Sequence, residues 1–213
     1  MAGTRSYGDA CGIARAFDVI GERWAPLIVR ELLLGPKRFT DIQVGLPKAS
    51  PNVLSQRLRE LEQAGVVRRR RLPPPAASQV YELTDWGQDL EPAFAALGRW
   101  GSRSPAPRSE TPLSVDALVV AMRTMCGPSP DPELNAMVEL RLGRDVFRAR
   151  VSSGRLHLSR GPCDRPDAVL ETEPVTLQGM LFHGHPLDDA LARGDARMQG
   201  DIDKVRALLA LFG

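Results

Sequence analysis

The chain has 213 residues, 43% of them hydrophobic and 25% charged, with a formal net charge of +2. This length suits two domains of about 100 residues each, and the composition excludes wholesale disorder. No stretch reaches the roughly 18 apolar residues that span a bilayer, and the N-terminus lacks the apolar core of a signal peptide, so we expect a cytoplasmic protein with no membrane partner.

Charge is distributed unevenly along the chain. Residues 21–71 hold eleven Lys or Arg against five Asp or Glu, whereas residues 104–213 hold thirteen against fifteen. A basic block inside an otherwise balanced protein indicates a polyanionic partner for that block alone.

Three short helices are predicted first. The first covers residues 11–20, where apolar residues recur at helical spacing: Ile13, Phe17 and Ile20. The second covers residues 24–34 and ends at Gly35-Pro36. The third is expected to begin with Thr40 as its N-cap, in a capping box with Gln43, and with Phe39 packed on Val44.

Signals for the next helix are clear at both of its ends. Ser50 suits the N-cap, Pro51 the first helical position and Gly65 the residue after the last turn. One face carries a stripe of leucines, and the opposite face of the first turns carries polar residues that suit base edges or phosphates: Asn52, Ser55, Gln56 and Arg59. Two short helices joined by a tight turn, the second with such a face, predict a helix-turn-helix rather than an ordinary amphipathic helix.

The stretch VVRRRRLPPPAASQVYELT predicts a β-hairpin directly after this helix, with strands over residues 66–72 and 79–83. Side chains alternate faces along a strand, so two of the four arginines face away from the core, and the prolines block pairing with other chains. A run of arginines alone indicates a solvated surface, but in the wing of a winged helix arginines are expected to meet phosphates. The expected contacts with double-stranded DNA are therefore Arg38, Thr40, Ser50, Asn52, Ser55, Gln56, Arg59, Arg69 and Arg71.

Thr84 is expected to cap one further helix with an aromatic stripe. Its apolar residues are Trp86, Leu90, Ala93, Phe94, Leu97 and Trp100. Such stripes exceed what a domain of about 90 residues can bury alone, so we expect a homodimer held by this helix and the first one. The Pro- and Ser-rich segment that follows predicts a linker over residues 102–112 between domains 1–101 and 113–213.

These motifs resemble the HxlR family of bacterial winged-helix transcription regulators over roughly residues 10–101. The resemblance rests on CGIARAFDVIGERW, SPNVLSQRLRELEQAGVVRR and VYELTDWGQDL, in the family's order, and the triple proline departs from the usual wing. It implies a non-enzymatic regulator, in our interpretation a repressor, that binds a pseudo-palindromic operator as a dimer.

Some members of that family sense oxidants through a cysteine at the first helix, which makes Cys11 a candidate redox residue. Free cysteine is nevertheless commonly a small buried hydrophobe, and no Lys, Arg or His within three residues before Cys11 lowers its pKa. We therefore favour a structural role for it. The three cysteines are widely spaced and lack a Cys-x-x-Cys pair, so neither a disulfide framework nor a thiolate zinc site is predicted.

Residues 113–213 resemble the sterol carrier protein type 2 fold in a more diffuse way. The strand-like segments are VELRL, VFRARV, LHLSR, AVLET and ARMQG, with a helix over residues 175–182 and a closing GDIDKVRALLALFG. The expected fold class is α+β, a winged helix-turn-helix followed by an α/β sandwich of about five strands with packed helices. The resemblance implies an apolar tunnel, whose expected lining for a small hydrophobic ligand is Phe147, Met180, Leu181, Phe182, Leu208, Leu209 and Phe212, with Arg150 or His157 orienting the ligand.

The sequence carries no catalytic constellation and no cofactor motif. His183 and His185 have no further metal ligand at a recognisable spacing, and there is no Gly-x-Ser-x-Gly elbow, so we expect neither a metal site nor catalysis. Five of the six methionines follow the linker, which suits a core and a ligand pocket equally. The leading hypothesis is a ligand-responsive regulator. The alternatives are a lipid-handling or enzyme-accessory protein, whose basic domain only tethers or dimerises, and a cysteine-based redox regulator.

Overall fold

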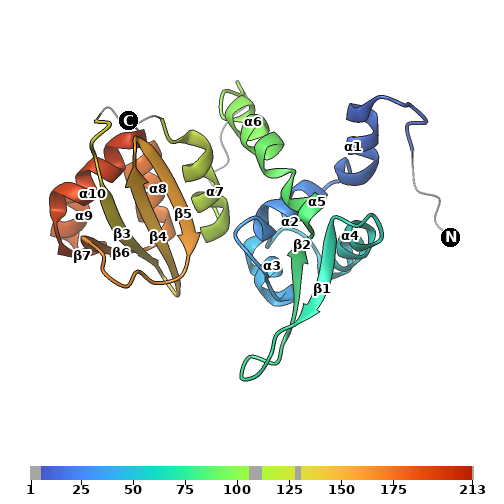
Figure 1. Cartoon of the computed structure of the whole chain (residues 1–213), viewed down its shortest axis with the longest axis horizontal. Helices are drawn as coiled ribbons and strands as arrows, with labels where there is room; N and C mark the ends of the chain where they lie inside the picture. The colour runs from blue at the N-terminus through green and yellow to red at the C-terminus, as the bar shows by residue number, and fades with distance from the viewer. Residues whose placement is uncertain (1–5, 106–111, 128–130, 213) are drawn as a thin grey trace. The chain divides into compact units, whose positions relative to one another are not determined.

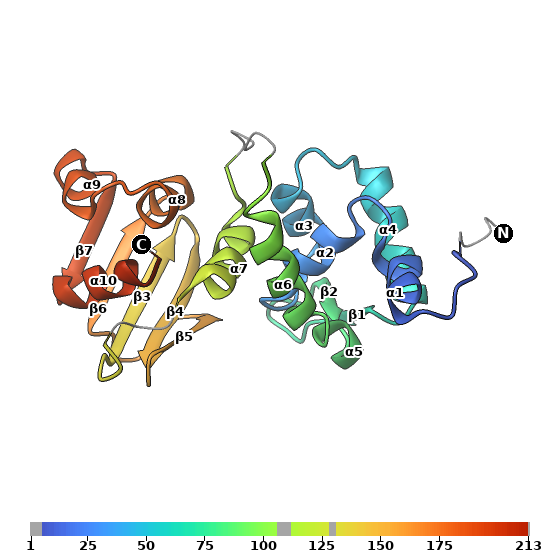
Figure 2. The same ribbon diagram turned by 90° about the horizontal axis from the view of Figure 1, so that it is seen from above.

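The computed structural model of the chain describes residues 6–105, 112–127 and 131–212. It divides into two compact units, unit 1 (residues 1–94) and unit 2 (residues 95–213), and the division falls inside helix α6 (Glu91–Gly101) (Figures 1 and 2). The middle of the expected linker, residues 106–111, lies outside the described residues.

Unit 1 is a set of short helices followed by a two-stranded antiparallel hairpin. Its elements are α1 (Gly12–Ile20), α2 (Ala25–Leu32), α3 (Phe39–Gly45), α4 (Pro51–Gln63), β1 (Val67–Arg71), β2 (Gln79–Leu83) and α5 (Asp85–Gln88). The apolar stripes of α2, α3 and α4 close over one core, whose largest fully buried side chains are Ile28, Leu32, Ile42, Leu54, Leu58 and Leu61. The expected start of α4 after Ser50 and the two expected wing strands are confirmed.

The start of α3 differs from the expectation. The helix begins at Phe39 with Arg38 as its N-cap, so the prediction of Thr40 as N-cap is wrong. The Asp41 carboxylate accepts the backbone N–H of Arg38 at 3.3 Å and so takes the capping role expected of Gln43. Val44 is 70% exposed, so the expected packing of Phe39 on Val44 is wrong as well.

The helix after the wing is also shorter than expected. Thr84 caps α5 as predicted, because its hydroxyl accepts the N–H of Gly87 at 3.1 Å. The helix then stops at Gln88, and α6 starts separately at Glu91. Pro92 explains the break, because its ring has no N–H to donate to the carbonyl four residues earlier and collides with that carbonyl.

Unit 2 contains the expected five-stranded sheet. Strands β3 (Ala136–Leu142), β4 (Asp145–Ser152), β5 (Arg155–Arg160), β6 (Ala168–Thr172) and β7 (Ala196–Gly200) lie in the order β5-β4-β3-β6-β7. β3 and β6 are parallel, and the other neighbours are antiparallel. The helices are α7 (Val115–Met125), α8 (Pro174–Phe182), α9 (Leu187–Arg193) and α10 (Ile202–Leu209), followed by the 3-10 turn η1 (Ala210–Phe212). Of these, α7 and α9 were not predicted from the sequence.

The unit 2 sheet has one apolar and one polar face. Leu140, Phe147 and Leu170 are fully buried on the inner face, against which α8 and α10 lie behind the sheet in Figure 1. Because side chains alternate along a strand, the residues between them point to the outer face. That outer face carries Arg148 and Arg150, and both are exposed.

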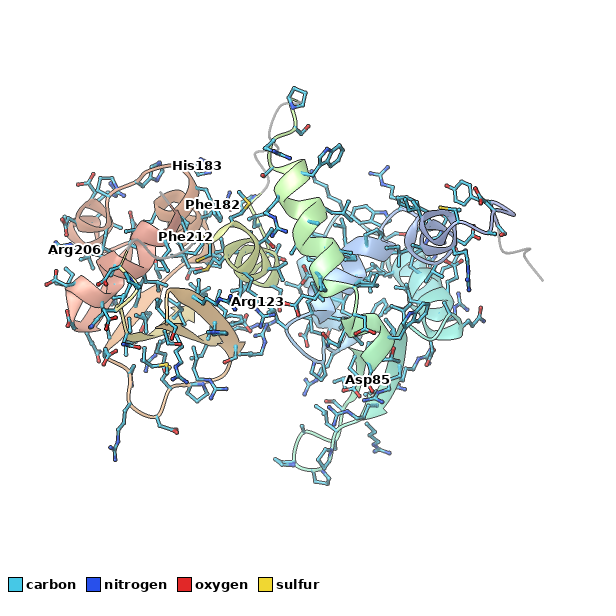
Figure 3. The ribbon with its side chains drawn as sticks, turned by 45° about the horizontal axis from the view of Figure 1, so that its top comes forward. Asp85, Arg123, Phe182, His183, Arg206 and Phe212 are labelled. Atoms are coloured by element: carbon cyan, nitrogen blue, oxygen red, sulfur yellow. The ribbon has the colours of Figure 1, made fainter. Side chains whose placement is uncertain are left out.

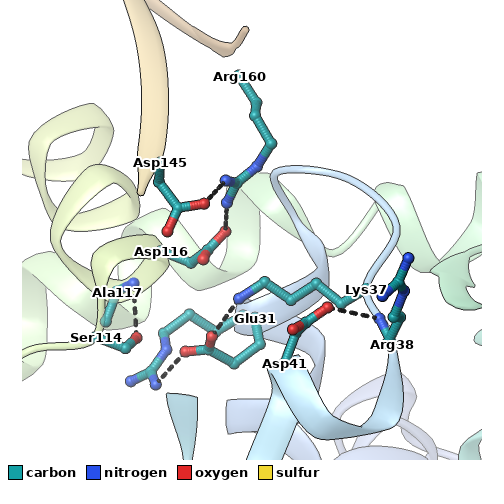
Figure 4. A network of polar contacts seen from close by, with 10 residues as sticks. Glu31, Lys37, Arg38, Asp41, Ser114, Asp116, Ala117, Asp145 and Arg160 are labelled. Atoms are coloured by element: carbon teal, nitrogen blue, oxygen red, sulfur yellow. Dashed lines mark hydrogen bonds and ion pairs between the residues drawn. The ribbon is translucent and has the colours of Figure 1, made fainter. Parts of the chain in front are cut away.

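Charged contacts fix α7 to the inner side of this sheet. The carboxylate of Asp116, only 4% exposed, accepts from Arg160 of β5 at 2.6 Å, and Arg160 also pairs with Asp145 (Figure 4). The same guanidinium lies 4.6 Å from the centre of the Phe147 ring. The buried acid is therefore fully compensated, which a carboxylate at this depth requires.

Candidate nucleic-acid interface

Helix α4 presents its first turns to solvent. The hydroxyl of Ser50 accepts the N–H of Val53 at 3.4 Å and fixes the start of the helix. Asn52, Gln56 and Arg59 are exposed on the side opposite the leucine stripe, with Ser55 half-buried beside them. The first N–H groups of a helix lack intrahelical acceptors and carry partial positive charge, so this end suits a phosphate.

Two of these polar side chains already have contacts within the helix. Gln56 donates from Nε2 to Glu60 at 3.0 Å, and Arg59 donates from Nε to the carbonyl of Ser55 at 3.3 Å. Asn52 has no side-chain partner among the described residues. Exposed contacts of this kind contribute little in water, so the side chains can exchange them for base edges or phosphates.

The start of α3 carries two more of the expected DNA contacts. Arg38 and Thr40 are both exposed there, one turn or less from the helix N-terminus. In a helix-turn-helix this helix precedes the recognition helix and crosses the DNA backbone, so these positions suit phosphates rather than bases.

One face of the wing holds a shared carboxylate. Arg68 and Arg70 lie on the same face of β1 as Glu82 of β2, which accepts from their Nε atoms at 2.7 and 2.9 Å. Glu82 is only 8% exposed, so it partly neutralises both arginines. Glu82 was not predicted as part of the site. Pairing the two strands by register would have found it, because Glu82 in the stretch VYEL then lies directly across from an arginine.

The other face of the wing carries Arg69 and Arg71, which were the expected phosphate contacts. Arg69 lies 3.1 Å from Glu62 of α4, and its guanidinium carbon is 5.4 Å from the centre of the Tyr81 ring. Arg71 is exposed and has no partner among the described residues. Arg71 is therefore the wing arginine with the least compensated charge.

Thr84 and Gly87 fasten the wing base to the end of α4. The Thr84 hydroxyl donates to the carbonyl of Gly65 at 2.7 Å, and its backbone N–H donates to Val66 at 3.0 Å. A Cβ at Gly87 would lie 2.2 Å from that same Val66 oxygen. The close approach allows no side chain, so the Leu-Thr-x-x-Gly stretch sets the position of the hairpin relative to the recognition helix.

A buried acid, Glu31, holds the opposite side of the wing. Its carboxylate has no exposed surface and accepts from Arg30 at 2.8 Å and Lys37 at 2.7 Å (Figure 4). Lys37 in turn pairs through its backbone with Tyr81 of β2, at 2.9 and 2.7 Å. The sequence reasoning missed this network, because its members meet only after α2 and the wing have folded together.

Cys11 is the N-cap residue of α1 and is exposed, so the expectation that it is a buried hydrophobe is wrong. Hydrogen bonds from the backbone N–H groups of Ile13 and Ala14 lower the pKa of its thiol. Cys126 and Cys163 are partly buried, and burial raises the pKa of each thiol.

The residues expected to line a ligand tunnel form the interior of unit 2. Phe147 and Leu208 have no exposed surface, and Phe182 meets Phe212 edge to face, with ring centres 6.2 Å apart (Figure 3). Met180 and Leu181 are buried, whereas Leu209 is half-buried. Two cavities in the described part of this unit, of about 320 and 310 Å³, are lined by other residues, the larger by polar groups around Glu171 and Asp195.

The polar residues expected near a ligand lie elsewhere. Arg150 and His157 are opposite each other on β4 and β5, on the outer face of the sheet, away from the apolar interior. The rings of His183 and His185 lie 6.2 Å apart after α8. Within residues 6–105, 112–127 and 131–212, no group of three or more His, Cys, Asp or Glu is placed to hold a metal ion. No helix in those ranges has the length and apolar character needed to cross a membrane.

The helix-turn-helix, the hairpin locked against its second helix and the basic residues on both define a winged-helix DNA-binding protein. The profile of the HxlR-like helix-turn-helix family matches residues 19–108. The chain is 42% identical over 88 residues to YvaP of Bacillus subtilis, an uncharacterized HTH-type transcriptional regulator. The matched segment covers 41% of this chain and 82% of YvaP. It is 38% identical over 92 residues to the HTH-type transcriptional regulator YodB of the same organism, with 43% of this chain and 82% of YodB covered.

A third relative matches over a longer span. The uncharacterized HTH-type transcriptional regulator Rv3095 of Mycobacterium tuberculosis is 34% identical over 132 residues, which is 61% of this chain and 77% of Rv3095. The chain belongs to the HxlR family of helix-turn-helix transcriptional regulators, as the sequence motifs predicted. The relatives are transcriptional regulators, and such proteins act by binding DNA.

Proposed function

We propose that the chain is a dimeric transcriptional repressor. Its α4 contacts the bases of the operator, and its wing binds the flanking phosphates. The observation that carries this proposal is the wing itself: Arg69 and Arg71 lie on one face of a hairpin that Thr84 and Gly87 lock to the end of α4. A hairpin fixed in this way holds its arginine side chains at a fixed distance from α4. Because the repressor acts on chromosomal DNA, we place it in the cytoplasm.

In this proposal the contacts divide by role. Asn52, Ser55, Gln56 and Arg59 on α4 face the bases, where amide and guanidinium groups form bidentate pairs worth about 1–3 kcal/mol of discrimination each. Arg38, Thr40 and Ser50 hold phosphates beside the helix, and Arg69 and Arg71 hold phosphates at the wing. Phosphate contacts position the protein and make binding depend on salt, but they carry no sequence information.

Exposed apolar side chains support the dimer. Ile13 and Phe17 on α1 are 69% and 50% exposed, and Leu97 and Trp100 on α6 are 53% and 72% exposed. Large apolar side chains gathered on helices mark interaction surfaces, because water contact with them is unfavourable. A two-fold dimer would present two α4 helices to the two halves of a pseudo-palindromic operator.

The test is a comparison of two duplexes. The full chain is titrated with the DNA upstream of its own gene and with random DNA of equal length, by fluorescence anisotropy at several salt concentrations. We expect tighter binding to the upstream DNA, and we expect Gln56→Ala with Arg59→Ala to reduce that preference while binding to random DNA persists. Equal affinity of the wild type for both duplexes at every salt concentration would contradict the repressor and favour a tethering role of the basic unit.

We further propose that unit 2 is a sterol-carrier-like sensor of a small hydrophobic ligand. The five-stranded sheet with helices on one face and the apolar layer around Phe147, Met180 and Leu208 support it. Since these side chains are packed, a ligand must displace some of them to enter. Melting of the full chain with fatty-acyl and sterol-like compounds tests the proposal. A ligand should raise the melting temperature and change operator affinity, and linkage requires operator DNA to change ligand affinity by the same factor.

A second candidate function is redox sensing by Cys11. Its exposed position and the lowered pKa of its thiol favour reaction with oxidants, because the thiolate is the nucleophile that attacks a peroxide. Mild peroxide treatment before the DNA titration decides between an oxidant and a hydrophobic ligand as the signal. If peroxide abolishes operator binding by the wild type but not by Cys11→Ser, the redox function is supported. Unchanged binding by the wild type excludes it.

A further inference from the structure

The outer face of the unit 2 sheet carries arginines that the proposed function does not use. Arg148 and Arg150 of β4 and Arg155 of β5 all point to this face, since register pairs Arg150 with His157 and Ser152 with Arg155. All three arginines are exposed, as is His157 between them. Neighbours on one face of a strand are about 6.6 Å apart, so the charges form a compact group.

These charges are largely uncompensated. Arg150 and Arg155 have no hydrogen-bond or ion-pair partner among the described residues, and Arg148 donates only to the carbonyl of Arg160, at 3.4 Å. On this face of β3, β4 and β5 the described acid is Glu139, which is 4% exposed. Its carboxylate is occupied by Arg141 and by the backbone N–H of Cys163, whose hydrogen bond lowers the pKa of Glu139.

Positive charge is also concentrated within the unit. Residues 141–165 hold seven arginines against two acids, whereas residues 166–213 hold four Lys or Arg against eight acids. Unit 2 as a whole holds fifteen Lys or Arg against fifteen Asp or Glu, yet it concentrates basic residues on β3, β4 and β5 and acids around β7, α9 and α10. Such a separation creates a local positive potential that attracts a polyanion.

We propose that this arginine face, Arg148, Arg150 and Arg155, binds the phosphate backbone of the DNA that flanks the site occupied by α4 and the wing. The inference rests on the proposed function, because the operator brings the polyanion. Duplex DNA carries one negative charge per 1.7 Å of axis, which matches a flat group of guanidinium ions. Since both units belong to one chain, binding of unit 1 raises the effective DNA concentration at unit 2 to about the millimolar range, where weak phosphate contacts suffice.

The test compares two variants on two duplexes. Arg150→Gln with Arg155→Gln removes two charges that have no partner among the described residues, so the fold should persist. Arg193→Gln with Arg197→Gln is the matched control, with the same charge change on the acidic side of the unit. Each full-length protein is titrated against a duplex trimmed to the shortest operator that the full chain still prefers over random DNA, and against one extended by about one helical turn, 10 bp, on each side.

We expect a defect of the first variant on the extended duplex alone. In the dimer the variant loses four phosphate contacts, two per protomer, so the slope of log affinity against log salt should become less steep by about 3.6, or 0.9 per contact. The affinity loss at 50 mM salt should then exceed that at 200 mM by about 150-fold. The control variant should keep the wild-type slope.

Equal slopes for the two variants on the extended duplex would overturn the inference. So would binding of the wild type to both duplexes with one slope, and this result would leave the proposed function intact. A wild type that binds neither duplex would overturn both this inference and the proposed function. If Arg150→Gln with Arg155→Gln instead abolished binding to phosphatidylserine vesicles and left DNA binding unchanged, the face would be a membrane surface and the inference would be wrong.

Discussion

Gly87→Ala tests whether the wing is locked to the recognition helix. A Cβ at this position would lie 2.2 Å from the Val66 carbonyl oxygen and 3.2 Å from the Leu83 Cβ, whereas ordinary contacts begin near 3.4 Å. The Val66 oxygen also accepts the Thr84 N–H at 3.0 Å. Alanine must therefore push α5 away from the wing base by about 1 Å, as overpacking does, and stretch that hydrogen bond.

The expected cost follows from these two effects. Overpacking of this kind costs about 1–3 kcal/mol and a lost hydrogen bond about 1 kcal/mol, so the free energy of unfolding of unit 1 should fall by about 2–4 kcal/mol. In a domain of this size each kcal/mol lowers the melting temperature by about 4–8 °C, so the transition of unit 1 should shift down by at least about 8 °C.

Differential scanning calorimetry of the full chain measures this shift. Gly12→Ala is the matched control, since Gly12 lies at the start of α1, where an added Cβ would meet no described atom within 4 Å. That variant should melt with the wild type or slightly above it. If Gly87→Ala melted together with Gly12→Ala, α5 would not be locked to the wing base.

Three other predictions concern the remaining contacts. Trp100→Ala should shift the full chain from dimer toward monomer in sedimentation at micromolar concentration, because it removes a side chain that is 72% exposed in the single chain; a monomeric wild type would contradict the dimer. Cys11 should react with iodoacetamide before Cys126 and Cys163 at pH 7.5. The pKa of the Cys11 thiol is lowered and those of the other two are raised, so a larger fraction of Cys11 is thiolate at that pH. Equal labelling of the three cysteines by mass spectrometry would contradict this order. Glu31→Gln should destabilise unit 1 in urea titration by about 1–3 kcal/mol, because Lys37 and Arg30 lose a buried charged acceptor; an unchanged midpoint would show that the network contributes nothing.

The sequence predicted those parts of unit 1 that local signals determine. The start and end of α4 follow from Ser50, Pro51 and Gly65, which act within one helical turn, and the wing strands follow from alternation. The break between α5 and α6 was also readable from Pro92, but the aromatic stripe across it favoured one continuous helix. By contrast, the start of α3 depends on where the chain leaves its pairing with the wing, because Lys37 is bonded to Tyr81 just before the helix.

The charged contacts of the site were harder to predict because their partners are distant in the chain. Glu82 meets Arg68 and Arg70 only once the hairpin register is set, and Glu31 meets Lys37 only around the folded core. In unit 2 the five strands were expected from strand-like segments and from the resemblance to the sterol carrier fold, but such segments do not say which face of the sheet the helices cover. For that reason Arg150 and His157 were assigned to a ligand, although they lie on the opposite face of the sheet from the apolar interior.

The proposed function requires the wing to contact DNA phosphates with the face that carries Arg69 and Arg71. Two double variants of β1 have the same charge change on the same strand but lie on opposite faces and differ in their carboxylate partners: Arg69→Gln with Arg71→Gln, and Arg68→Gln with Arg70→Gln. The salt dependence of full-length protein binding to random duplex DNA is measured for both. We predict that the first variant loses up to about 3.6 from the slope, or 0.9 for each of four phosphate contacts in the dimer. The second variant should lose less, because Glu82 already binds both of its arginines, whereas Glu62 pairs with Arg69 alone. An unchanged slope for the first variant, or a larger loss for the second, would show that the face with Arg69 and Arg71 is not the one that contacts DNA.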